Sequence, residues 1–239
     1  MVLLEAALNG SRSPAEHPAI PISAAQIAAA AQESAAAGAG AVHFHVRDGD
    51  GRETVAAAWV ARAVVEMRKH RVPFGVSTGA WIISDPARRL RAVEEWTMLP
   101  DFVSINFHEE GAGELAAFFL ERQVGIEAGV ANAVGAERLV QSRLGNRCLR
   151  VLLEPQEQVT AEAMTTVTEI EAILDDGGVT ATRLLHGADA TAWTLVDTAR
   201  ARGYGTRIGL EDSLTLPDGV IAPGNGDLVR AALARLAKA

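Results

Sequence analysis

The feature that most constrains the fold is a strand-like segment followed by a helix-like segment, repeated eight times along the chain. The strand candidates are short apolar runs bounded by turn residues, at 2–10, 41–48, 74–79, 101–107, 124–129, 149–154, 183–187 and 206–212. The helix candidates have apolar residues at helical spacing, at 24–37, 54–70, 85–98, 114–122, 132–144, 161–174, 190–202 and from 225 onward. Strict alternation produces a parallel sheet, and eight units close naturally into a (β/α)8 TIM barrel. We therefore expect residues 1–239 to form a single barrel domain.

An open, doubly wound sheet is the alternative arrangement of the same elements. It predicts a glycine-rich dinucleotide fingerprint after the first strand, and the sequence has none there. The length of 239 residues suits one barrel, which typically needs about 250. Hydrophobic residues make up 49% of the chain, which supports a large core. The barrel is therefore the favoured fold.

Charge and composition exclude several classes of partner. The net charge of −8 argues against nucleic acid, whose binding requires a basic surface. No apolar run approaches the roughly 20 residues of a membrane span, and the first residues lack the pattern of a signal peptide. The single cysteine, Cys148, excludes an intramolecular disulfide and suits a reducing compartment. We expect a cytoplasmic protein with no nucleic-acid or membrane partner.

Two histidines lie two residues apart in the second strand candidate, where Ala41-Val42-His43-Phe44-His45-Val46-Arg47-Asp48 precedes a Gly-containing turn. Side chains alternate between the faces of a strand, so His43 and His45 should project to the same side. A pair of imidazoles on a rigid strand is half of a divalent metal site. The alternative is two core histidines with satisfied hydrogen bonds. Arg47 continues the same face, which favours the ligand pair.

The last strand candidate offers the missing ligand. By the same period of two, Arg207, Gly209 and Glu211 share one face, so the Glu211 carboxylate is the best third ligand. The alternative for Glu211 is a salt bridge to an arginine. Two imidazoles and one carboxylate with an open position suit catalytic Zn²⁺, and they also suit non-haem Fe(II). Asp212, which follows directly, could turn over the pocket and act as a general base.

Further polar residues end the other strand candidates. In a barrel the active site lies at the carboxyl ends of the strands, so these side chains should surround it. They are Asn9, Ser77, Thr78, Ser104, Asn106, Glu127, Glu154 and His186. For His186 three roles stay open: a further metal ligand, a substrate contact, or a plain core histidine.

Together these motifs resemble the β-keto acid cleavage enzymes, whose type member is the 3-keto-5-aminohexanoate cleavage enzyme. The resemblance rests on residues 43–48 and 207–212, and on Asn9-Gly10, Ser77-Thr78-Gly79, Ser104-Ile105-Asn106 and Ile126-Glu127 in matching order. It implies a Zn²⁺-dependent barrel, usually a homo-oligomer (tetramer or dimer). Such an enzyme cleaves a β-keto acid with acetyl-CoA and gives acetoacetate and an acyl-CoA.

The resemblance also implies a role for each motif residue. The metal ligands would be His43, His45 and Glu211. Asp212 would be the base, Arg207 would stabilise oxyanions, and Glu127 would be a polar residue of the catalytic pocket. The residues predicted to bind substrate are Ser77, Thr78, Ser104, Asn106 and Asn9.

One segment departs from the family pattern. After the sixth strand the family generally has a glycine-rich segment, whereas this chain has Glu154-Pro155-Gln156-Glu157. An acidic turn is poorly suited to the phosphate tail of CoA. A second hypothesis therefore keeps the metal and enolate chemistry without CoA, as a hydrolase or aldolase-type lyase acting on a keto acid. A third is a barrel that binds a metal or a small acid as a sensor or scaffold.

Overall fold

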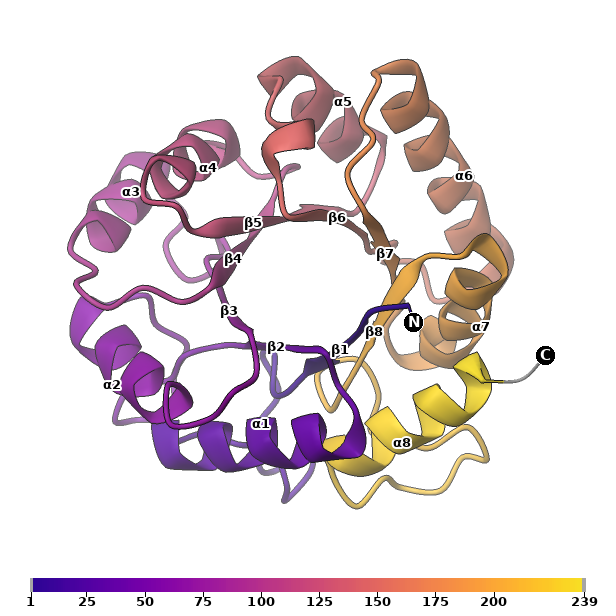
Figure 1. The fold of residues 1–239 in the computed structure, drawn as a ribbon, viewed down its shortest axis with the longest axis horizontal. Helices are drawn as coiled ribbons and strands as arrows, with labels where there is room; N and C mark the ends of the chain where they lie inside the picture. Colours follow the sequence, from indigo (N-terminus) through magenta and orange to yellow (C-terminus); the bar gives the residue numbers. More distant parts are fainter. Residues whose placement is uncertain (1, 238–239) are drawn as a thin grey trace.

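Eight short parallel strands form a closed ring over residues 2–237, the part of the chain that the computed structural model describes (Figure 1). They pair in sequence order, and β1 also pairs with β8, which closes the barrel. The strands are β1 (Leu4–Ala7), β2 (Ala41–Phe44), β3 (Phe74–Ser77), β4 (Phe102–Asn106), β5 (Gly125–Val130), β6 (Arg150–Leu153), β7 (Arg183–Leu185) and β8 (Gly205–Ile208). The predicted (β/α)8 barrel is confirmed.

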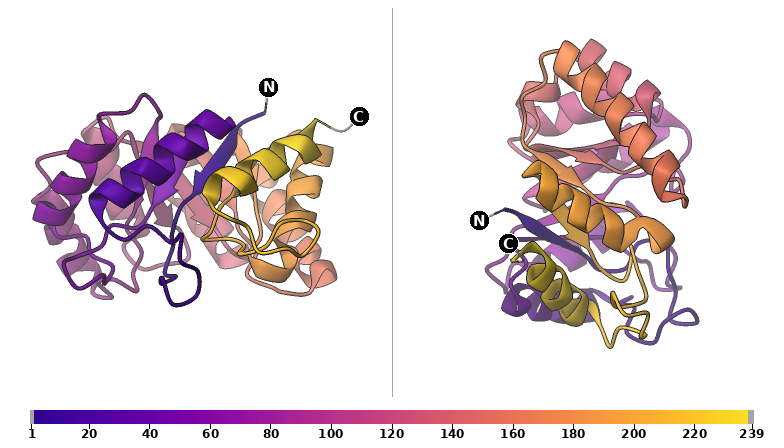
Figure 2. Two further views of the ribbon diagram at one scale, coloured as in Figure 1. Left: turned by 90° about the horizontal axis from the view of Figure 1, so that it is seen from below. Right: turned by 90° about the vertical axis from the view of Figure 1, so that its right-hand side faces the viewer.

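A helix follows each strand and covers the outside of the ring (Figure 1). The helices are α1 (Ala24–Ala37), α2 (Ala57–Met67), α3 (Pro86–Glu94), α4 (Ala112–Glu121), α5 (Ala133–Ser142), α6 (Thr160–Asp176), α7 (Ala192–Arg202) and α8 (Asn225–Leu236). Two 3₁₀ turns, η1 (Gly145–Arg147) and η2 (Asp189–Thr191), precede β6 and α7. Helices α1 and α8 pack side by side, so the outer ring is closed as well (Figure 2). None of these helices is both long and apolar enough to cross a lipid bilayer, within residues 2–237.

Local sequence explains where α1 begins and ends. Ser23 and Gln26 form a capping box, in which each side chain meets the backbone N–H of the other residue. Gly38 ends the helix in a left-handed conformation with φ +113°, which glycine adopts at little cost. The chain then turns directly into β2, which carries the first of the two histidines.

The hydrophobic core lies between the strands and the helices, whereas the barrel interior is partly ionic. On β2, Val42 and Phe44 are fully buried in the outer layer. Inside the barrel, Arg150 Nε donates to Glu127 at 2.6 Å, and Arg150 Nη2 is paired with Glu5. Both carboxylates are completely buried, so Arg150 supplies the positive charge that burial of two acids requires.

The strands are shorter than the sequence patterns predict, and the difference concerns the site. β8 ends at Ile208, which pairs with Ala6, and the backbone turns away at Gly209 although β1 continues to Ala7. The prediction that Glu211 lies on the face of the last strand was therefore wrong. Gly209 begins a turn instead, and the Glu211 N–H donates to the Ala7 carbonyl at 3.2 Å. His45 likewise lies one residue beyond β2.

The two longest loops lie at the carboxyl end of the barrel (Figure 2). They connect β1 to α1 (residues 8–23) and β8 to α8 (residues 209–224). The N–H of Leu8 donates to the His43 carbonyl at 2.9 Å, and this hydrogen bond holds the start of the first loop against β2. Both loops therefore begin beside the predicted metal ligands.

Candidate metal centre and substrate cavity

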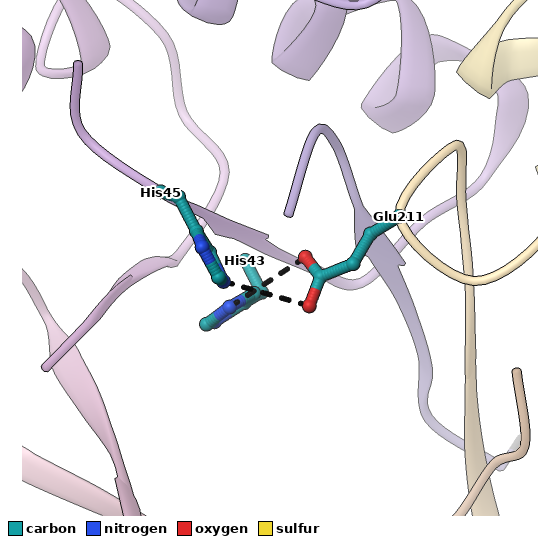
Figure 3. Close-up of side chains that lie close together, drawn as sticks. All are labelled: His43, His45 and Glu211. Atoms are coloured by element: carbon teal, nitrogen blue, oxygen red, sulfur yellow. Dashed lines mark ion pairs between the residues drawn. The ribbon is translucent and has the colours of Figure 1, made fainter. Parts of the chain in front are cut away.

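His43, His45 and Glu211 converge at the carboxyl end of the barrel, although they come from opposite ends of the sequence (Figure 3). His43 Nε2 lies 3.7 Å from Glu211 Oε2, and His45 Nε2 lies 3.5 Å from Glu211 Oε1. The two imidazole rings are perpendicular, with centroids 5.2 Å apart. Both histidines thus present the same ring nitrogen to one carboxylate.

A glycine makes room for the Glu211 side chain. Gly10, at the start of the β1–α1 loop, has φ +52°, and a Cβ there would lie 2.4 Å from Glu211 Cγ. Any larger residue would displace the carboxylate and would be strained as well. The turn at Gly209 is equally close, since a Cβ there would lie 1.9 Å from the Ala7 carbonyl oxygen. The space at these two glycines allows the Glu211 side chain to reach the histidines although Glu211 is not on a strand.

The three side chains fit a divalent cation. Their separations of 3.5 and 3.7 Å are too long for strong hydrogen bonds. They are close to the roughly 3.3–3.5 Å between neighbouring ligand atoms around a tetrahedral zinc ion with bonds of about 2.0–2.1 Å. Glu211 Oε2 is also buried without a hydrogen-bond partner among the described residues. A set of two imidazoles and one carboxylate can therefore hold a metal here.

A second carboxylate holds His45 in place. Glu53 Oε1 is hydrogen-bonded to His45 Nδ1, and the same oxygen accepts the Trp81 indole N–H at 3.1 Å. The Trp81 ring also stacks on the His45 ring, with centroids 5.7 Å apart and planes 25° from parallel. His45 Nδ1 is occupied in this way, so Nε2 is the nitrogen left for a metal. Such carboxylate–histidine pairs are usual behind metal-binding histidines.

The charges of the two histidines differ. Burial lowers the pKa of His43 to about 4, although the Glu211 carboxylate opposes the shift. Burial also disfavours a charge on His45, but the carboxylates of Glu211 and Glu53 outweigh it and raise the pKa of His45 to about 9. The Arg207 guanidinium keeps the pKa of Glu211 well below its usual range, although burial has the opposite effect. At neutral pH His43 is neutral and Glu211 is ionised, as metal ligands must be, whereas His45 holds a proton that a bound metal would have to displace.

Arg207 connects Glu211 of the candidate metal centre to a second group of titratable side chains. Its Nη2 donates to Glu211 Oε1 at 3.1 Å and to Asp212 Oδ1 at 2.7 Å. His186 Nδ1 lies 3.3 Å from the same Asp212 oxygen, and its Nε2 lies 3.6 Å from Glu154 Oε2. The other Asp212 oxygen, Oδ2, is buried without a hydrogen-bond partner among residues 2–237. A carboxylate with one fixed and one free oxygen is suited to accept a proton.

These groups line a cavity of about 570 Å³, a volume suited to a small-molecule substrate. Its lining includes residues of the candidate metal centre and its support (His45, Glu211, Trp81). It also includes the second group of titratable side chains (Arg207, Asp212, His186, Glu154) and further polar residues (Arg12, Asn106, His108, Asn132, Gln156). Asn106 Oδ1 and Glu154 Oε1 approach each other over Gly129, where a Cβ would lie 2.5 Å from each. His186, which the sequence left with three possible roles, lies in the cavity wall beside Asp212.

Several of the predicted substrate-binding residues lie outside this cavity. Asn9 is fully buried and supports His45: its Nδ2 donates to the His45 carbonyl at 2.9 Å, and its Oδ1 accepts the His45 N–H at 2.8 Å. The Thr78 hydroxyl donates to the Ser104 carbonyl at 2.8 Å. Ser77 and Ser104 are paired in register on β3 and β4. Of the predicted substrate set, the structure brings Asn106 to the cavity wall.

Glu127 lies beneath the metal site and not in the cavity wall. Its partner is Arg150 of the neighbouring strand, and it is fully buried, close to Glu5 and His43. Burial raises the pKa of Glu127, but the Arg150 guanidinium outweighs this effect and lowers the pKa to about 2. Glu127 therefore places a permanent negative charge under His43, a role for which its position on β5 gave no signal.

Three residues of the site were not predicted from the sequence, namely Glu53, Trp81 and Arg12. Glu53 follows a tight turn, in which Asp48 Oδ1 accepts the N–H groups of Asp50 and Arg52, both at 2.9 Å. This turn folds Glu53 back against β2, and the turn-forming residues 48–51 were a signal for the reversal. No comparable pattern marks Trp81 or Arg12, which reach the cavity from irregular loops.

A family model described as β-keto acid cleavage enzyme matches residues 1–134 and 156–239, which is most of the chain. This chain belongs to the β-keto acid cleavage enzyme family. The predicted resemblance is therefore confirmed, and with it membership of a family of enzymes that cleave β-keto acids. The residues between the two matched parts include β6 and Glu154, so the acidic segment 154–157 begins at the end of the interruption and its last two residues lie in the matched part.

Solved structures of other proteins share the barrel of this β-keto acid cleavage family member. The apo structure of ObcA has a TM-score of 0.69 and 18% identity, over 91% of this chain and 61% of that one. The ternary complex of ObcA with a C4-CoA adduct and oxalate has a TM-score of 0.71 and 18% identity, over 92% and 64%. A 3-dehydroquinate dehydratase from Aquifex aeolicus VF5 has a TM-score of 0.58 and 12% identity, over 98% and 96%. At these identities the likeness shows the fold alone.

The chain spans less than two thirds of the length of the ObcA chains that it matches. Among curated proteins, none matches this sequence significantly. Family membership thus rests on the sequence pattern, and the three-dimensional comparisons support the barrel.

Proposed function

We propose that the protein is a Zn²⁺-dependent enzyme that transfers the acyl part of a β-keto acid to CoA. The reaction is R–CO–CH₂–COO⁻ + CH₃–CO–SCoA → R–CO–SCoA + CH₃–CO–CH₂–COO⁻. One C–C bond of the keto acid breaks, and an equivalent C–C bond forms in acetoacetate. The thiolate changes its acyl partner, so no oxidant or reductant is consumed.

The observation that carries this proposal is the convergence of His43, His45 and Glu211 beside the free oxygen of Asp212, in a chain of this family. A zinc ion held by the three ligands would polarise the keto oxygen of the substrate and acidify the adjacent CH₂ group. The catalytic base must then lie close to the metal ligands, and Asp212 follows Glu211 directly in the sequence.

Asp212 Oδ2 is the atom that accepts the proton of the CH₂ group. Its other oxygen accepts a hydrogen bond from Arg207 at 2.7 Å and lies 3.3 Å from His186 Nδ1, which orients the free one. Arg207 is charged at all relevant pH values, since neighbouring carboxylates raise its pKa well above normal against the effect of burial. Its guanidinium stabilises the negative charge that develops on oxygen during the acyl transfer.

Two roles follow for the residues around this centre. Glu53 and Asn9 fix the ring and the backbone of His45, and so position a ligand without contacting substrate. Asn106 and Glu154 lie together on the cavity wall, where they would contact the variable acyl part of the keto acid. We assign specificity for this acyl part to these two residues.

The test is mass spectrometry of the zinc-loaded protein incubated with acetyl-CoA and a panel of β-keto acids. A new acyl-CoA that appears together with acetoacetate supports the proposal, and its mass identifies the acyl part. Unchanged acetyl-CoA and unchanged keto acids over a broad panel would contradict it.

A second candidate is a CoA-independent hydrolase or lyase acting on a keto acid at the same metal centre. It is favoured by Glu154, an acid in the cavity wall at the interruption of the family pattern. In the same experiment this candidate predicts loss of a keto acid while acetyl-CoA stays intact. Competition of CoA with the keto acid would count against it.

A further inference from the structure

A second cavity, of about 510 Å³, adjoins the metal site on the outside of the barrel. It lies between the segment that enters α2 and helix α3, which are neighbours in the outer ring (Figure 1). Glu53 belongs to its wall, while the partners of Glu53, namely His45 and Trp81, line the substrate cavity. The hydrogen-bonded side chains of Glu53 and Trp81 therefore lie between the two cavities at this point.

This outer cavity has two free positive charges. Arg88 and Arg91 are three residues apart on α3, line the cavity and are exposed. Over residues 2–237, neither guanidinium has a hydrogen-bond or ion-pair partner. Other arginines near the carboxyl end of the barrel are engaged with protein acceptors, namely Arg12, Arg47, Arg52, Arg89, Arg138 and Arg207.

The rest of the cavity wall combines apolar and polar side chains. Ile82 and Ile83 are partly buried and contribute the side nearest Trp81, and Val55 lies below them. Two acids are present: Glu53 is occupied by His45 and Trp81, and Glu95 is exposed just after the end of α3. An apolar surface next to two unpaired guanidinium groups fits a ligand with a flat base and phosphate groups.

We propose that this cavity binds the phosphorylated nucleotide end of the acyl-CoA whose thioester reacts at the metal centre. The inference rests on the proposed function. CoA carries its diphosphate and 3′-phosphate at the opposite end of a long flexible arm from the sulfur, so the nucleotide must bind outside the reaction cavity. Arg88 and Arg91 supply the charge, and the arm would cross from one site to the other over the exposed Trp81 ring.

A larger cavity between α1 and α2, of about 660 Å³, is the competing location for the nucleotide. Its basic residues are Arg47 and Arg62. Arg47 Nη2 donates to the backbone carbonyls of Gly10 and Arg12, and the Arg62 guanidinium lies 4.6 Å from the centre of the Trp59 ring. Both guanidinium groups therefore already have partners in the protein, whereas those of Arg88 and Arg91 have none among residues 2–237. The free positive charge favours the cavity at α3 as the site for phosphate groups.

The first test compares acetyl-CoA with acetyl-pantetheine, which lacks the phosphorylated nucleotide, in the zinc-loaded enzyme. In the double variant Arg88→Ala/Arg91→Ala, we expect the preference in kcat/KM for acetyl-CoA over acetyl-pantetheine to fall about tenfold at low ionic strength. Activity with acetyl-pantetheine should be unchanged. Arg62→Ala is the matched control, and it should keep the wild-type preference. A lost preference in Arg62→Ala with an unchanged preference in the double variant would overturn the proposal.

The second test measures binding without turnover, with adenosine 3′,5′-bisphosphate as the probe. Titration calorimetry should show about tenfold weaker binding to the double variant than to wild type, and Arg88→Lys/Arg91→Lys should restore part of it. Equal binding to wild type and the double variant would overturn the proposal. Binding that depends on Arg88 and Arg91 in a protein without acyl transfer would instead retain this site and refute the proposed reaction.

Discussion

The hydrogen bond between Glu53 and His45 yields a quantitative prediction about metal affinity. In Glu53→Gln the side chain keeps its size, but the negative charge behind His45 Nδ1 disappears. The same oxygen also accepts the Trp81 N–H at 3.1 Å, so one substitution weakens both supports of the ring. We expect zinc to bind more weakly because His45 is then a poorer donor and less firmly oriented.

The magnitude follows from the position of Glu53 behind the ligand. Removing such a carboxylate typically weakens metal binding about 10–100-fold, which corresponds to about 1.4–2.7 kcal/mol. The Glu53 side chain is only 13% exposed, so solvent compensates little for its loss. Trp81→Phe keeps an aromatic ring against His45 and removes only the N–H, and we expect it to cost less than about 1 kcal/mol.

The assay is competition for zinc with a chromophoric chelator at pH 7. Glu66→Gln is the control, since Glu66 is an acid on α2 whose partner is the exposed Lys69. An affinity of Glu53→Gln within about twofold of both wild type and the control, in a folded protein, would refute the reasoning. The readout is binding, so the result holds whatever reaction the enzyme catalyses.

Four further predictions concern the rest of the site and the fold. Glu211→Ala should lose most of the zinc, measured by metal analysis after dialysis, whereas Asp212→Asn should keep the zinc and lose turnover; full activity of Asp212→Asn would show that another group is the base. Gly10→Ala should also release zinc, since its Cβ would lie 2.4 Å from the Glu211 side chain, and wild-type zinc content would contradict this. Burial and Arg207 disfavour a charge on His186, but neighbouring carboxylates raise its pKa to about 9, so the folded state holds a proton that the unfolded chain loses near pH 6.5. The free energy of unfolding should therefore fall between about pH 6.5 and 9 in wild type and fall less in His186→Asn, by urea denaturation. Burial raises the pKa of Cys148 to about 12, so iodoacetamide at pH 8 should label the unfolded protein and not the folded one.

The fold was predictable because its signal is periodic. Eight apolar strands separated by eight amphipathic helices leave few topologies open, and the observed order β1 to β8 is the one expected. The residues at which the strands end could not be predicted from this periodicity. β8 leaves the ladder after Ile208 although its neighbour β1 continues to Ala7, and the two-residue spacing within one strand does not show where the backbone turns away.

The three predicted metal ligands illustrate what the two-residue period could and could not predict. His43 and His45 were predicted from the two-residue period, and they do face the same side although His45 lies beyond β2. Glu211 was predicted from the same period, and its side chain arrives at the histidines through a turn at Gly209 instead. The residue type and its place near the end of β8 were thus informative, but the geometry behind the prediction was not the observed one.

The supporting residues were largely beyond prediction. Trp81 and Glu53 meet His45 from two different loops, and such contacts depend on how the loops pack, which no local pattern encodes. Asn9 and Thr78 were noticed as polar residues near strand ends, yet their side chains bind backbone atoms. A polar side chain at the end of a barrel strand can bind either backbone atoms or the substrate, and the sequence alone does not distinguish these roles.

The most direct test of the proposed reaction follows the carbon atoms of the acetyl group. The zinc-loaded enzyme would be incubated with acetyl-CoA labelled with ¹³C at both acetyl carbons and with an unlabelled β-keto acid that it consumes. The account predicts acetoacetate with two ¹³C atoms, at the methyl and keto carbons, and an unlabelled acyl-CoA from the keto acid. Label that remains in acetyl-CoA while the keto acid disappears would contradict the account and favour CoA-independent cleavage at the same metal centre.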